Sequence, residues 1–303
     1  MAFYSPLRYP GGKGKISDFF YATIEANNLN NGVYVEPYAG GSSIALSLLI
    51  NGYVSEIIIN DIDRSIYAFW KSVLEYNDEL CRLITKTRVN LSTWNKCKEV
   101  QKSKTKASIL DLGFSTFFLN RTNRSGIING GVIGGKEQDG DWKIDARYNK
   151  QALISRIKLI REYRKHIKLY NKDAHDFVKQ IIPSFDSKTL CYFDPPYFEK
   201  GKALYVNYYE NKDHQKIADA ISSIRNTKWI VSYDNKNEIK NMYNQFRSNE
   251  YNLRYSAAET RSGSEIMFFS DDLEVSKDMI VSLHNKETNS VKNNNTRRAL
   301  WRG

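Results

Sequence analysis

Three short apolar runs in this sequence each end in polar or turn-forming residues. The run Val33–Val35 is followed by a glycine-rich turn and then by an apolar helical segment. The β-branched run Glu56–Asn60 ends at Asp61, and the run Thr189–Phe193 ends at Asp194. A strand, a glycine turn and a helix in that order form the first unit of a nucleotide-binding α/β sheet. The pattern therefore predicts an α/β protein built on such a sheet.

Further periodic segments extend this arrangement along the chain. Two late runs, Leu253–Ala257 and Glu265–Ser270, flank the turn-forming residues Thr260–Gly263 and predict an antiparallel hairpin. Residues 284–303 are rich in Asn and basic side chains and predict a disordered basic tail. Apolar patterns also predict strands and helices, the strands over 167–170 and 229–233 and the helices near 16–25, 70–83, 109–118, 151–166 and 212–224.

The basic charge of the chain is concentrated in its centre. The protein has 303 residues and a formal net charge of +11. Between Cys81 and Tyr170 there are 20 Lys and Arg against 7 Asp and Glu, and the rest of the chain carries 25 against 27. A concentrated basic block is typical of a surface that binds a polyanion, most simply a nucleic acid. A solvated basic face without a binding role is the alternative.

Cysteine and histidine are too sparse for several classes of site. Cys81, Cys97 and Cys191 lie far apart with no CxxC pattern, which favours a reduced, cytoplasmic protein over a disulfide-stabilised one. The 4 histidines form no HxxxH or HxE pattern, so we expect no bound metal. No apolar stretch reaches the roughly 18 residues of a membrane-spanning helix, so we expect no membrane association.

The segment Asp194-Pro195-Pro196-Tyr197 is the sharpest feature of the sequence. The two prolines stiffen the chain at the end of a strand and leave the Pro195 carbonyl able to accept a hydrogen bond from a ligand. That carbonyl and the Asp194 carboxylate offer two acceptors for an NH₂ group, and Tyr197 offers a face for a planar ring. An adenine amine fits this arrangement once the base has flipped out of the duplex. The alternative is a structural Pro-Pro turn with Asp194 as a cap.

Two other segments carry side chains suited to a ligand. Asp61 lies 21 residues after Gly40, where a Rossmann-type fold places the carboxylate that binds ribose hydroxyls. A compatible alternative is that Asp61 caps the helix that begins near Ser65. In the basic block, Asn120–Gly126 combines Asn and Arg, which read adenine and guanine edges, and Arg also grips phosphate. An incidental surface loop is the other interpretation of that segment.

Together these segments resemble the Dam-like DNA adenine-N6 methyltransferases over roughly residues 5–270. The resemblance follows the family's order of cofactor motif, glycine loop, acidic ribose motif, Asn-Arg pair, catalytic tetrapeptide, later strand end and closing hairpin. Members that methylate GATC have a Tyr-rich recognition hairpin, which this sequence does not repeat, so GATC is not implied. The matching segments are Arg8–Lys13, Val35–Ser42, Asn60–Asp63, Leu119–Arg121, Asp194–Tyr197, Ser232–Asp234 and Arg261–Phe269.

The resemblance implies a fold and a division of the chain. The expected fold is α/β, with a Rossmann-like methyltransferase sheet, a closing antiparallel hairpin and an inserted, mainly helical DNA-recognition domain. The catalytic domain that binds S-adenosylmethionine is expected over residues 1–80 and 167–283. The basic target-recognition insert is expected over residues 81–166, followed after the catalytic domain by the tail, 284–303.

The resemblance also implies which residues act. The residues expected to hold the flipped adenine and serve catalysis are Asp194, Pro195, Pro196 and Tyr197. The residues expected to bind the cofactor, S-adenosylmethionine, are Tyr9, Lys13, Glu36, Gly40, Asp61 and Asp194. The residues expected to contact DNA are Asn120, Arg121, Asn123 and Arg124.

These expectations describe a site-specific enzyme that transfers a methyl group from S-adenosylmethionine to N6 of a flipped-out adenine in double-stranded DNA. The alternatives are methylation of another amine, namely cytosine N4, adenine in RNA or a protein glutamine, and a DNA-binding regulator with an inactive core. We expect a cytoplasmic monomer of bacterial or phage origin. Restriction–modification with an endonuclease encoded nearby, phage defence and gene regulation are all compatible with this activity.

Three other positions are interpreted structurally. His214, near a helix start, is expected to be a surface cap rather than a general acid. Trp142 is expected to lie in the core rather than to stack on DNA, because Trp is more often buried. The segment Asn207–Tyr209 either closes over the flipped base or packs against its neighbours.

Overall fold

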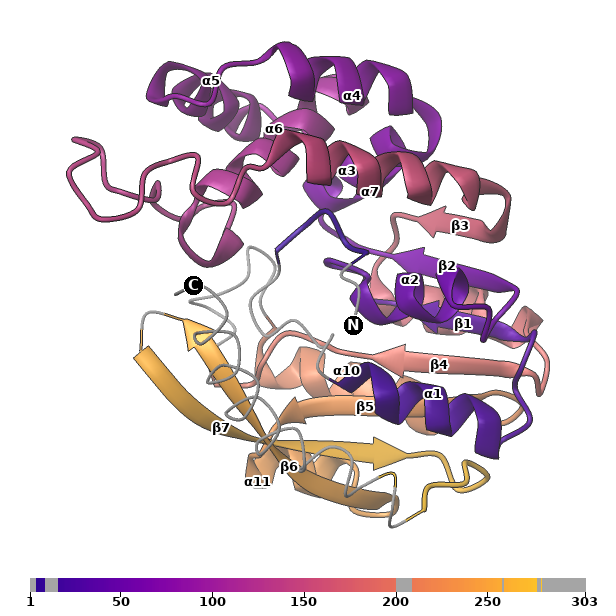
Figure 1. Ribbon diagram of the computed structural model, residues 1–303. Coiled ribbons are helices and arrows are strands. Elements are labelled where there is room, and N and C mark those ends of the chain that lie inside the picture. The colour runs from indigo at the N-terminus through magenta and orange to yellow at the C-terminus, as the bar shows by residue number, and fades with distance from the viewer. Residues whose placement is uncertain (1–3, 9–15, 200–208, 258, 277–278, 280–303) are drawn as a thin grey trace, which may run out of the picture.

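A seven-stranded sheet in the order β3-β2-β1-β4-β5-β7-β6 runs through the middle of the molecule (Figure 1). This computed structural model describes residues 4–8, 16–199, 209–257, 259–276 and 279. The strands from β3 to β5 are parallel, whereas β7 runs antiparallel to both β5 and β6. The strands are β1 (Val33–Glu36), β2 (Glu56–Asn60), β3 (Ile167–Tyr170), β4 (Thr189–Phe193), β5 (Lys228–Asp234), β6 (Arg247–Ala257) and β7 (Glu259–Phe269).

Helices cover both faces of the sheet, as the α/β prediction requires. The helices are α1 (Ser17–Ala26), α2 (Ser43–Ile50), α3 (Arg64–Glu75), α4 (Asn77–Lys86), α5 (Leu91–Lys102), α6 (Ile109–Thr122), α7 (Lys150–Glu162), α8 (Ala174–Gln180), α10 (Asn211–Ser222) and α11 (Asn237–Met242). Short 3₁₀ turns occur at η2 (Arg124–Gly126), η3 (Arg164–His166) and η4 (Ile182–Ser184). The predicted α/β sheet with a closing antiparallel hairpin is confirmed.

Alternating side chains of the buried strands supply two separate apolar cores. On β4, Leu190 and Tyr192 pack with α1, α2 and α3 on one face of the sheet, whereas Cys191 and Phe193 pack with α8 and α10 on the other. Successive strand residues point to opposite faces, so a strand buried on both faces has an unbroken apolar sequence. This explains why the run Thr189–Phe193 shows no polar alternation.

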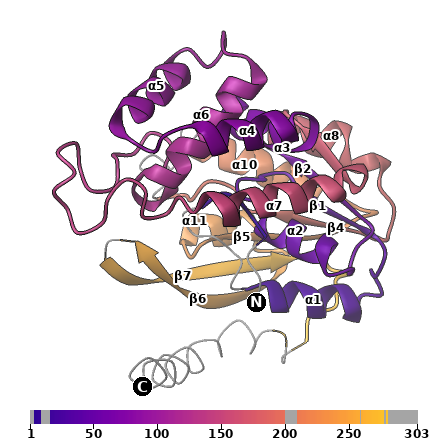
Figure 2. The ribbon, with the colours of Figure 1, turned by 45° about the horizontal axis from the view of Figure 1, so that its top comes forward.

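Helix α6 of the central block lies directly on α3. A Cβ added to Gly113 would lie 2.3 Å from the Ser72 hydroxyl and 2.6 Å from the Ala68 carbonyl, so only glycine permits this approach. Nearby, the rings of Phe69 and Phe117 stack with their centroids 6.0 Å apart. The central block, residues 81–166, therefore rests on the sheet through a close helix pair. Figures 1 and 2 show its helices at the β3 end of the sheet order and the β6–β7 hairpin at the other end.

Several predicted elements differ from the structure in their bounds. Strand β6 ends at Ala257 and β7 begins at Glu259, so the residues Thr260–Gly263 belong to β7 instead of forming the turn. The predicted helix over 70–83 is two helices, because α3 ends at Glu75 and α4 starts at Asn77. The helix predicted over 151–166 ends at Glu162 and is followed by the turn η3. The tail, 284–303, lies outside the described residues.

The strand order reverses between β1 and β4. The chain proceeds from β1 to β2 and β3 on one side, and from β4 to β5 on the other, while β1 and β4 pair directly. Ligands of open α/β sheets bind beside the carboxyl ends of the strands at such a reversal. Glu36 ends β1 and Asp194 follows β4, so both lie at this edge. Among the helices described, none is long and apolar enough to cross a membrane.

Candidate active site

Asp194 is oriented by two hydroxyl groups from buried strands. The Ser232 hydroxyl on β5 donates to Oδ1 of Asp194 at 2.9 Å. The Tyr192 hydroxyl on β4 lies 2.7 Å from the same Ser232 oxygen. Because Ser232 uses its proton for Asp194, Tyr192 is the donor in this second bond. A relay of two hydroxyls thus sets the direction of the Asp194 carboxylate.

The other residues of the tetrapeptide are buried, and Tyr197 is tied to the closing hairpin. Its hydroxyl donates to Oε1 of Glu265 on β7 at 2.7 Å. Oε2 of Glu265 accepts from the hydroxyl of Tyr251 on β6. Glu265 is 1% exposed, so both bonds lie in the interior. The ring of Tyr197 is therefore held from the hairpin side, while Pro195 and Pro196 are buried beside it.

The chain directly after the tetrapeptide is held by Asp234 at the end of β5. Its two carboxylate oxygens accept from the backbone N–H groups of Phe198 and Glu199 at 2.8 and 3.1 Å. Lys236 also pairs with the Glu199 carboxylate at 2.7 Å. The predicted strand-end motif Ser232–Asp234 thus acts on both sides of the tetrapeptide, through Ser232 before it and Asp234 after it.

Glu36 is a buried carboxyl group beside the glycine turn. It is 5% exposed and accepts from the backbone N–H of Ala45, in the first turn of α2, at 3.1 Å. Burial, with a smaller contribution from the charge of Asp194, raises the pKa of Glu36 to about 8, and the hydrogen bond from Ala45 opposes this rise. Two carboxyl groups of the predicted site therefore lie close enough to repel each other.

Asp61 faces the glycine turn from the end of β2. Its Oδ2 accepts from the backbone N–H of Gly40 at 3.0 Å, and its Oδ1 accepts from Asp63 at 2.9 Å. Burial raises the pKa of Asp61 to about 7, with a smaller contribution from the charge of Asp63. The expected helix cap is instead Asp63, which accepts from the backbone N–H of Ser65 at 2.9 Å. Gly40 and Asp61, predicted from their spacing, are brought together.

The predicted DNA-contacting residues divide into interior and surface positions. Asn120 is 1% exposed, and its amide pairs with both backbone groups of Arg8, at 2.7 and 2.6 Å. Asn123 is 0% exposed and bonds to Trp94 and to the carbonyls of Ile127 and Ile128. Their amides therefore organise the turn after α6, and their positions give no support to direct contact with DNA.

The two arginines of the same segment differ from each other. Arg121, in the last turn of α6, is 8% exposed, whereas Arg124 is exposed at the start of η2. Arg124 is therefore the predicted DNA contact that already faces solvent. Tyr9 and Lys13, predicted to bind the cofactor, lie outside the described residues.

Sequence reasoning missed an aromatic group behind the tetrapeptide. The expected surface cap His214 is 1% exposed, and its ring lies against Phe198, Tyr209 and Tyr233. Burial lowers the pKa of His214 to about 4, so the ring is neutral near pH 7. Tyr209 packs here, with its hydroxyl 3.0 Å from that of Tyr38. Glu265 was missed as well, because nothing local in the sequence links it to Tyr197.

Trp142 is also placed differently from its prediction. It is 66% exposed, in the loop before α7, and the Arg147 guanidinium lies 5.7 Å from the centre of its ring. The loop is held from within by Gln138, whose amide bonds to the carbonyls of Ile133 and Gly135. The expectation of a core position for Trp142 was therefore wrong, whereas Ile144, two residues further on, is buried in the apolar core.

A family model described as D12 class N6 adenine-specific DNA methyltransferase matches residues 9–257. The chain belongs to this family. The resemblance inferred from the sequence motifs is thereby confirmed. The enzyme transfers a methyl group from S-adenosylmethionine to N6 of adenine in DNA, which decides against the other amines and the inactive regulator.

The chain is also similar to several individual proteins. The D12 methyltransferase is 23% identical to the type II methyltransferase M.MjaIII of Methanocaldococcus jannaschii over 228 residues, or 69% of this chain and 75% of the relative. It also resembles TrmK of M. capricolum, solved with S-adenosylhomocysteine, with 9% identity, a TM-score of 0.31 and coverage of 88% and 75% of the two chains. For the rRNA methyltransferase AviRa of Streptomyces viridochromogenes the identity is 11%, the TM-score 0.34 and the coverage 84% and 85%.

The acidic edge of the D12 methyltransferase fits the charge of its cofactor. S-adenosylmethionine carries a sulfonium and an ammonium cation, and it supplies the methyl group as an electrophile when bound. Glu36, Asp61 and Asp194 place three carboxyl groups at the carboxyl ends of β1, β2 and β4. A cation beside them offsets the repulsion and the desolvation that raise the pKa values of Glu36 and Asp61.

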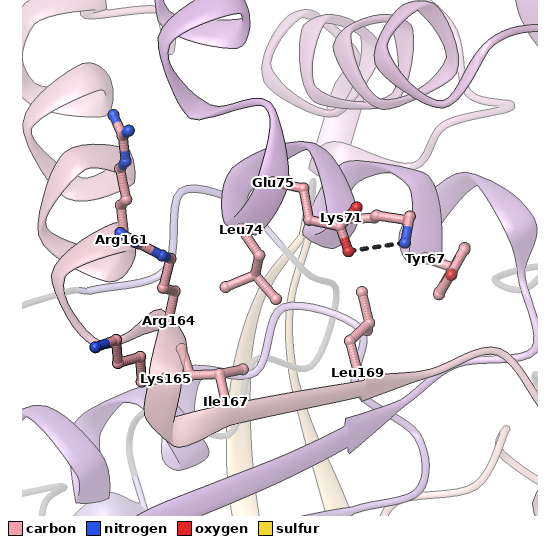
Figure 3. A pocket seen from close by; sticks show the side chains of 9 residues that line it. All are labelled: Tyr67, Lys71, Leu74, Glu75, Arg161, Arg164, Lys165, Ile167 and Leu169. Atoms are coloured by element: carbon pink, nitrogen blue, oxygen red, sulfur yellow. Dashed lines mark hydrogen bonds and ion pairs between the residues drawn. The ribbon is translucent and has the colours of Figure 1, made fainter.

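A separate pocket of the methyltransferase, about 580 Å³ in volume, lies between α3, α7 and β3 (Figure 3). Its rim carries Lys71, Arg161, Arg164 and Lys165, of which Lys71 pairs with Glu75 at 2.8 Å and Arg161 with Asp78 at 2.6 Å. None of the described site residues lines this pocket. It therefore lies apart from the carboxyl edge of β1 and β4.

Proposed function

We propose that the Asp194 carboxylate and the Pro195 carbonyl accept the two hydrogens of the adenine N6 amine, while the base stacks on Tyr197. The observation that carries this proposal is the pair of anchors on the tetrapeptide, Ser232 on Asp194 and Glu265 on Tyr197. Anchored acceptors hold the amine in one orientation, so its lone pair points towards the methyl donor without further rearrangement. Two acceptors also draw the nitrogen towards a tetrahedral geometry, which localises that lone pair.

The proposed reaction needs no strong base. The amine loses its proton only once the new N–C bond makes the nitrogen cationic, and the proton then leaves to water. Asp194 serves as a hydrogen-bond acceptor that stabilises the growing positive charge. His214 has no part in this step, because its ring is neutral, buried and bonded through Nδ1 to the Tyr233 hydroxyl at 3.1 Å.

The residues proposed to hold the cofactor follow the carboxyl edge of the sheet. Asp61, at the end of β2, binds the ribose hydroxyls of the cofactor. Its neighbour Ile62 covers the adenine ring of the cofactor. Ile62 supports this placement because it is an apolar side chain with 44% of its surface exposed directly beside the ribose position. Glu36 and Gly40 line the methionine end, and the sequence motif predicts that Tyr9 and Lys13 also contact the cofactor.

The proposal also covers the partners of the enzyme and the compartment in which it acts. We infer a monomer that acts on duplex DNA through the basic insert, 81–166, in a reducing compartment. Support for the compartment comes from the three cysteines, which are all free thiols and form no disulfide. An endonuclease that cuts the same unmethylated motif is the partner to seek among neighbouring genes.

The test expresses the chain in a bacterial host that lacks its own adenine methylation. Modified bases in genomic DNA are then mapped at single-base resolution for the wild type, for Asp194→Ala and for the surface control Asp176→Ala. We expect N6-methyladenine at one short motif in the wild type and the control, and none with Asp194→Ala. Methylation that survives Asp194→Ala would contradict the assigned role of this residue.

A further inference from the structure

The buried Arg121 and the half-buried Arg8 each have one enclosed nitrogen atom without a hydrogen-bond partner. Nε of Arg121 and Nη1 of Arg8 are both inaccessible to water and make no hydrogen bond. The Arg121 side chain as a whole is 8% exposed. An unpaired buried cation is among the most unfavourable groups a fold can contain, so it indicates a missing counter-charge.

Two more arginines, the half-buried Arg156 and the exposed Arg147, lie near enough to act electrostatically on Arg121. Arg156, on α7, donates to the backbone carbonyl of Ser5 at 3.2 Å, three residues before Arg8. Arg147 precedes Tyr148, whose ring packs against Phe117 and Phe118 one turn before Arg121 on α6. Burial, together with smaller contributions from the charges of Arg156, Arg8 and Arg147, lowers the pKa of Arg121 to about 9. We refer to Arg8, Arg121, Arg147 and Arg156 as the arginine cage.

No carboxylate of the described residues neutralises the cage. The ion pairs found in the described part of the chain do not include any of its four arginines. The hydroxyl of Tyr148 is also buried there without a hydrogen-bond partner. Guanidinium and phenol groups can all donate hydrogen bonds to an anion. The unpaired groups here therefore all favour an anion as their partner.

The cage is held in place by the turn after α6. The Asn120 amide pairs with the N–H and the C=O of Arg8 and also donates to the Gly126 carbonyl at 2.9 Å. Gly126 has a φ of +78°, and a Cβ there would lie 2.5 Å from the Arg8 carbonyl. Glycine therefore lets the segment of Arg8 reach α6. The buried Asn120 therefore fixes the shape of the cage, and the arginines supply its positive charge.

We propose that the arginine cage binds one phosphodiester group of the substrate DNA. This inference rests on the DNA substrate of the proposed function. Guanidinium groups match the oxygens of a phosphate with paired N–H donors. Three of the four arginines belong to the basic insert, which favours the DNA backbone over the carboxylate of the cofactor, whose expected site is at the acidic edge of the sheet.

The test replaces single phosphates of a duplex by neutral methylphosphonates. The duplex carries the motif found by the genomic mapping, and binding is measured for the wild type, Arg121→Gln, Arg156→Gln and the control Arg164→Gln, an exposed arginine of η3. We expect one methylphosphonate to weaken binding by the wild type and the control about tenfold, as loss of a charged hydrogen bond does. The same methylphosphonate should cause no further weakening of DNA binding by the Arg121→Gln and Arg156→Gln variants.

A salt titration and a cofactor titration complete the test. With unmodified DNA, the slope of log K against log salt should fall by about one for each cage variant and stay unchanged for Arg164→Gln. Weaker binding of S-adenosylmethionine with an unchanged salt slope would assign the cage to the cofactor and overturn the proposal. The proposal would also be overturned if each methylphosphonate weakened DNA binding equally for the wild type and the cage variants. If the wild type methylates no adenine, the proposed function fails instead.

Discussion

The phenol of Tyr197 donates to the carboxylate of Glu265 across the junction of the parallel sheet and its antiparallel hairpin. Glu265 pairs in the sheet with Asp234 on one side and with Tyr251 on the other. The same hairpin strand thus contacts the ring proposed to stack on adenine and pairs with Asp234, which holds the chain after the tetrapeptide. The closing hairpin is part of the active site as well as of the fold.

We predict that Glu265→Gln slows methylation about tenfold or more, because an amide offers only one acceptor oxygen for the two phenols and the ring of Tyr197 loses its fixed position. The reduction should appear in kcat, with little change in KM for S-adenosylmethionine. Fluorescence of 2-aminopurine at the target base measures flipping directly. Tyr251→Phe is the matched control, since it leaves the Tyr197 bond intact. Equal losses for both variants would indicate a general packing effect.

Ser232→Ala should lower kcat about tenfold, because it removes the hydrogen bond that orients Asp194. Ser232→Thr keeps the hydroxyl and should recover most of the rate. Single-turnover methylation of the motif duplex, together with cofactor affinity, separates this effect from binding. If the alanine and threonine variants are equally slow, the hydroxyl itself has no positioning role.

The raised pKa of Glu36 predicts that S-adenosylmethionine binds more tightly as the pH rises from about 6 to about 9, since the cofactor cation prefers the ionised carboxylate. Binding should release protons, which calorimetry in buffers of different ionisation enthalpy detects. Glu36→Gln should flatten the pH dependence. An unchanged pH profile in this variant would assign the titration to another group.

The same shift predicts the opposite trend for the stability of the protein without ligand. Between pH 4.5, the ordinary pKa, and about pH 8, the folded state keeps a proton on Glu36 that the unfolded state has lost. The free energy of unfolding contributed by this group therefore falls as the pH rises through that window. Urea unfolding of the wild type and Glu36→Gln across the window measures the difference, and parallel curves would contradict it.

Removing the buried charge of Arg121 should stabilise the protein while weakening DNA binding. Arg121→Gln relieves repulsion from three other arginines, and we expect an increase of about 1–3 kcal/mol in the free energy of unfolding. Sulfate should stabilise the wild type more than the variant, because it binds the folded cage. Thermal unfolding at constant ionic strength, with chloride as the reference anion, provides the comparison. A less stable variant would mean that the charge is compensated within the fold.

Asn120→Ala should cost about 1–3 kcal/mol of stability, because it leaves the backbone groups of Arg8 and Gly126 without their partner. Its recognition motif, mapped in genomic DNA, should be unchanged. A relaxed motif with unchanged stability would support the original prediction that Asn120 reads a base.

The elements of the sheet could be predicted because each strand is a local apolar run followed by a turn. The pairing of Gly40 with Asp61 was also accessible, since a fixed spacing reflects one strand–helix–strand unit. The turn of the β6–β7 hairpin was misplaced because Thr260–Gly263 contains turn-forming residues that the structure uses within β7. Local composition indicates a hairpin but does not fix its register.

Tertiary contacts account for the rest. The side-chain amide of Asn120 is chemically suited to base recognition. Its burial, however, depends on Arg8, which lies 112 residues away in the sequence. Glu265 and Tyr197 are separated by 68 residues, and no local pattern connects a strand carboxylate to a distant phenol. Trp142 shows the converse, because it is an apolar residue left 66% exposed in a loop that Gln138 closes on itself.

The short segment before residue 9 joins two parts of the chain that its sequence order keeps apart. Ser5 donates to the Gly41 carbonyl in the glycine turn at 2.5 Å, and Arg8 is bound to Asn120 of the insert. A chimera that exchanges residues 81–166 for the insert of a relative would therefore cut through this joint. Grafts intended to change the methylated motif should carry residues 5–8 along with the insert, as one exchangeable module made of two separate pieces of sequence.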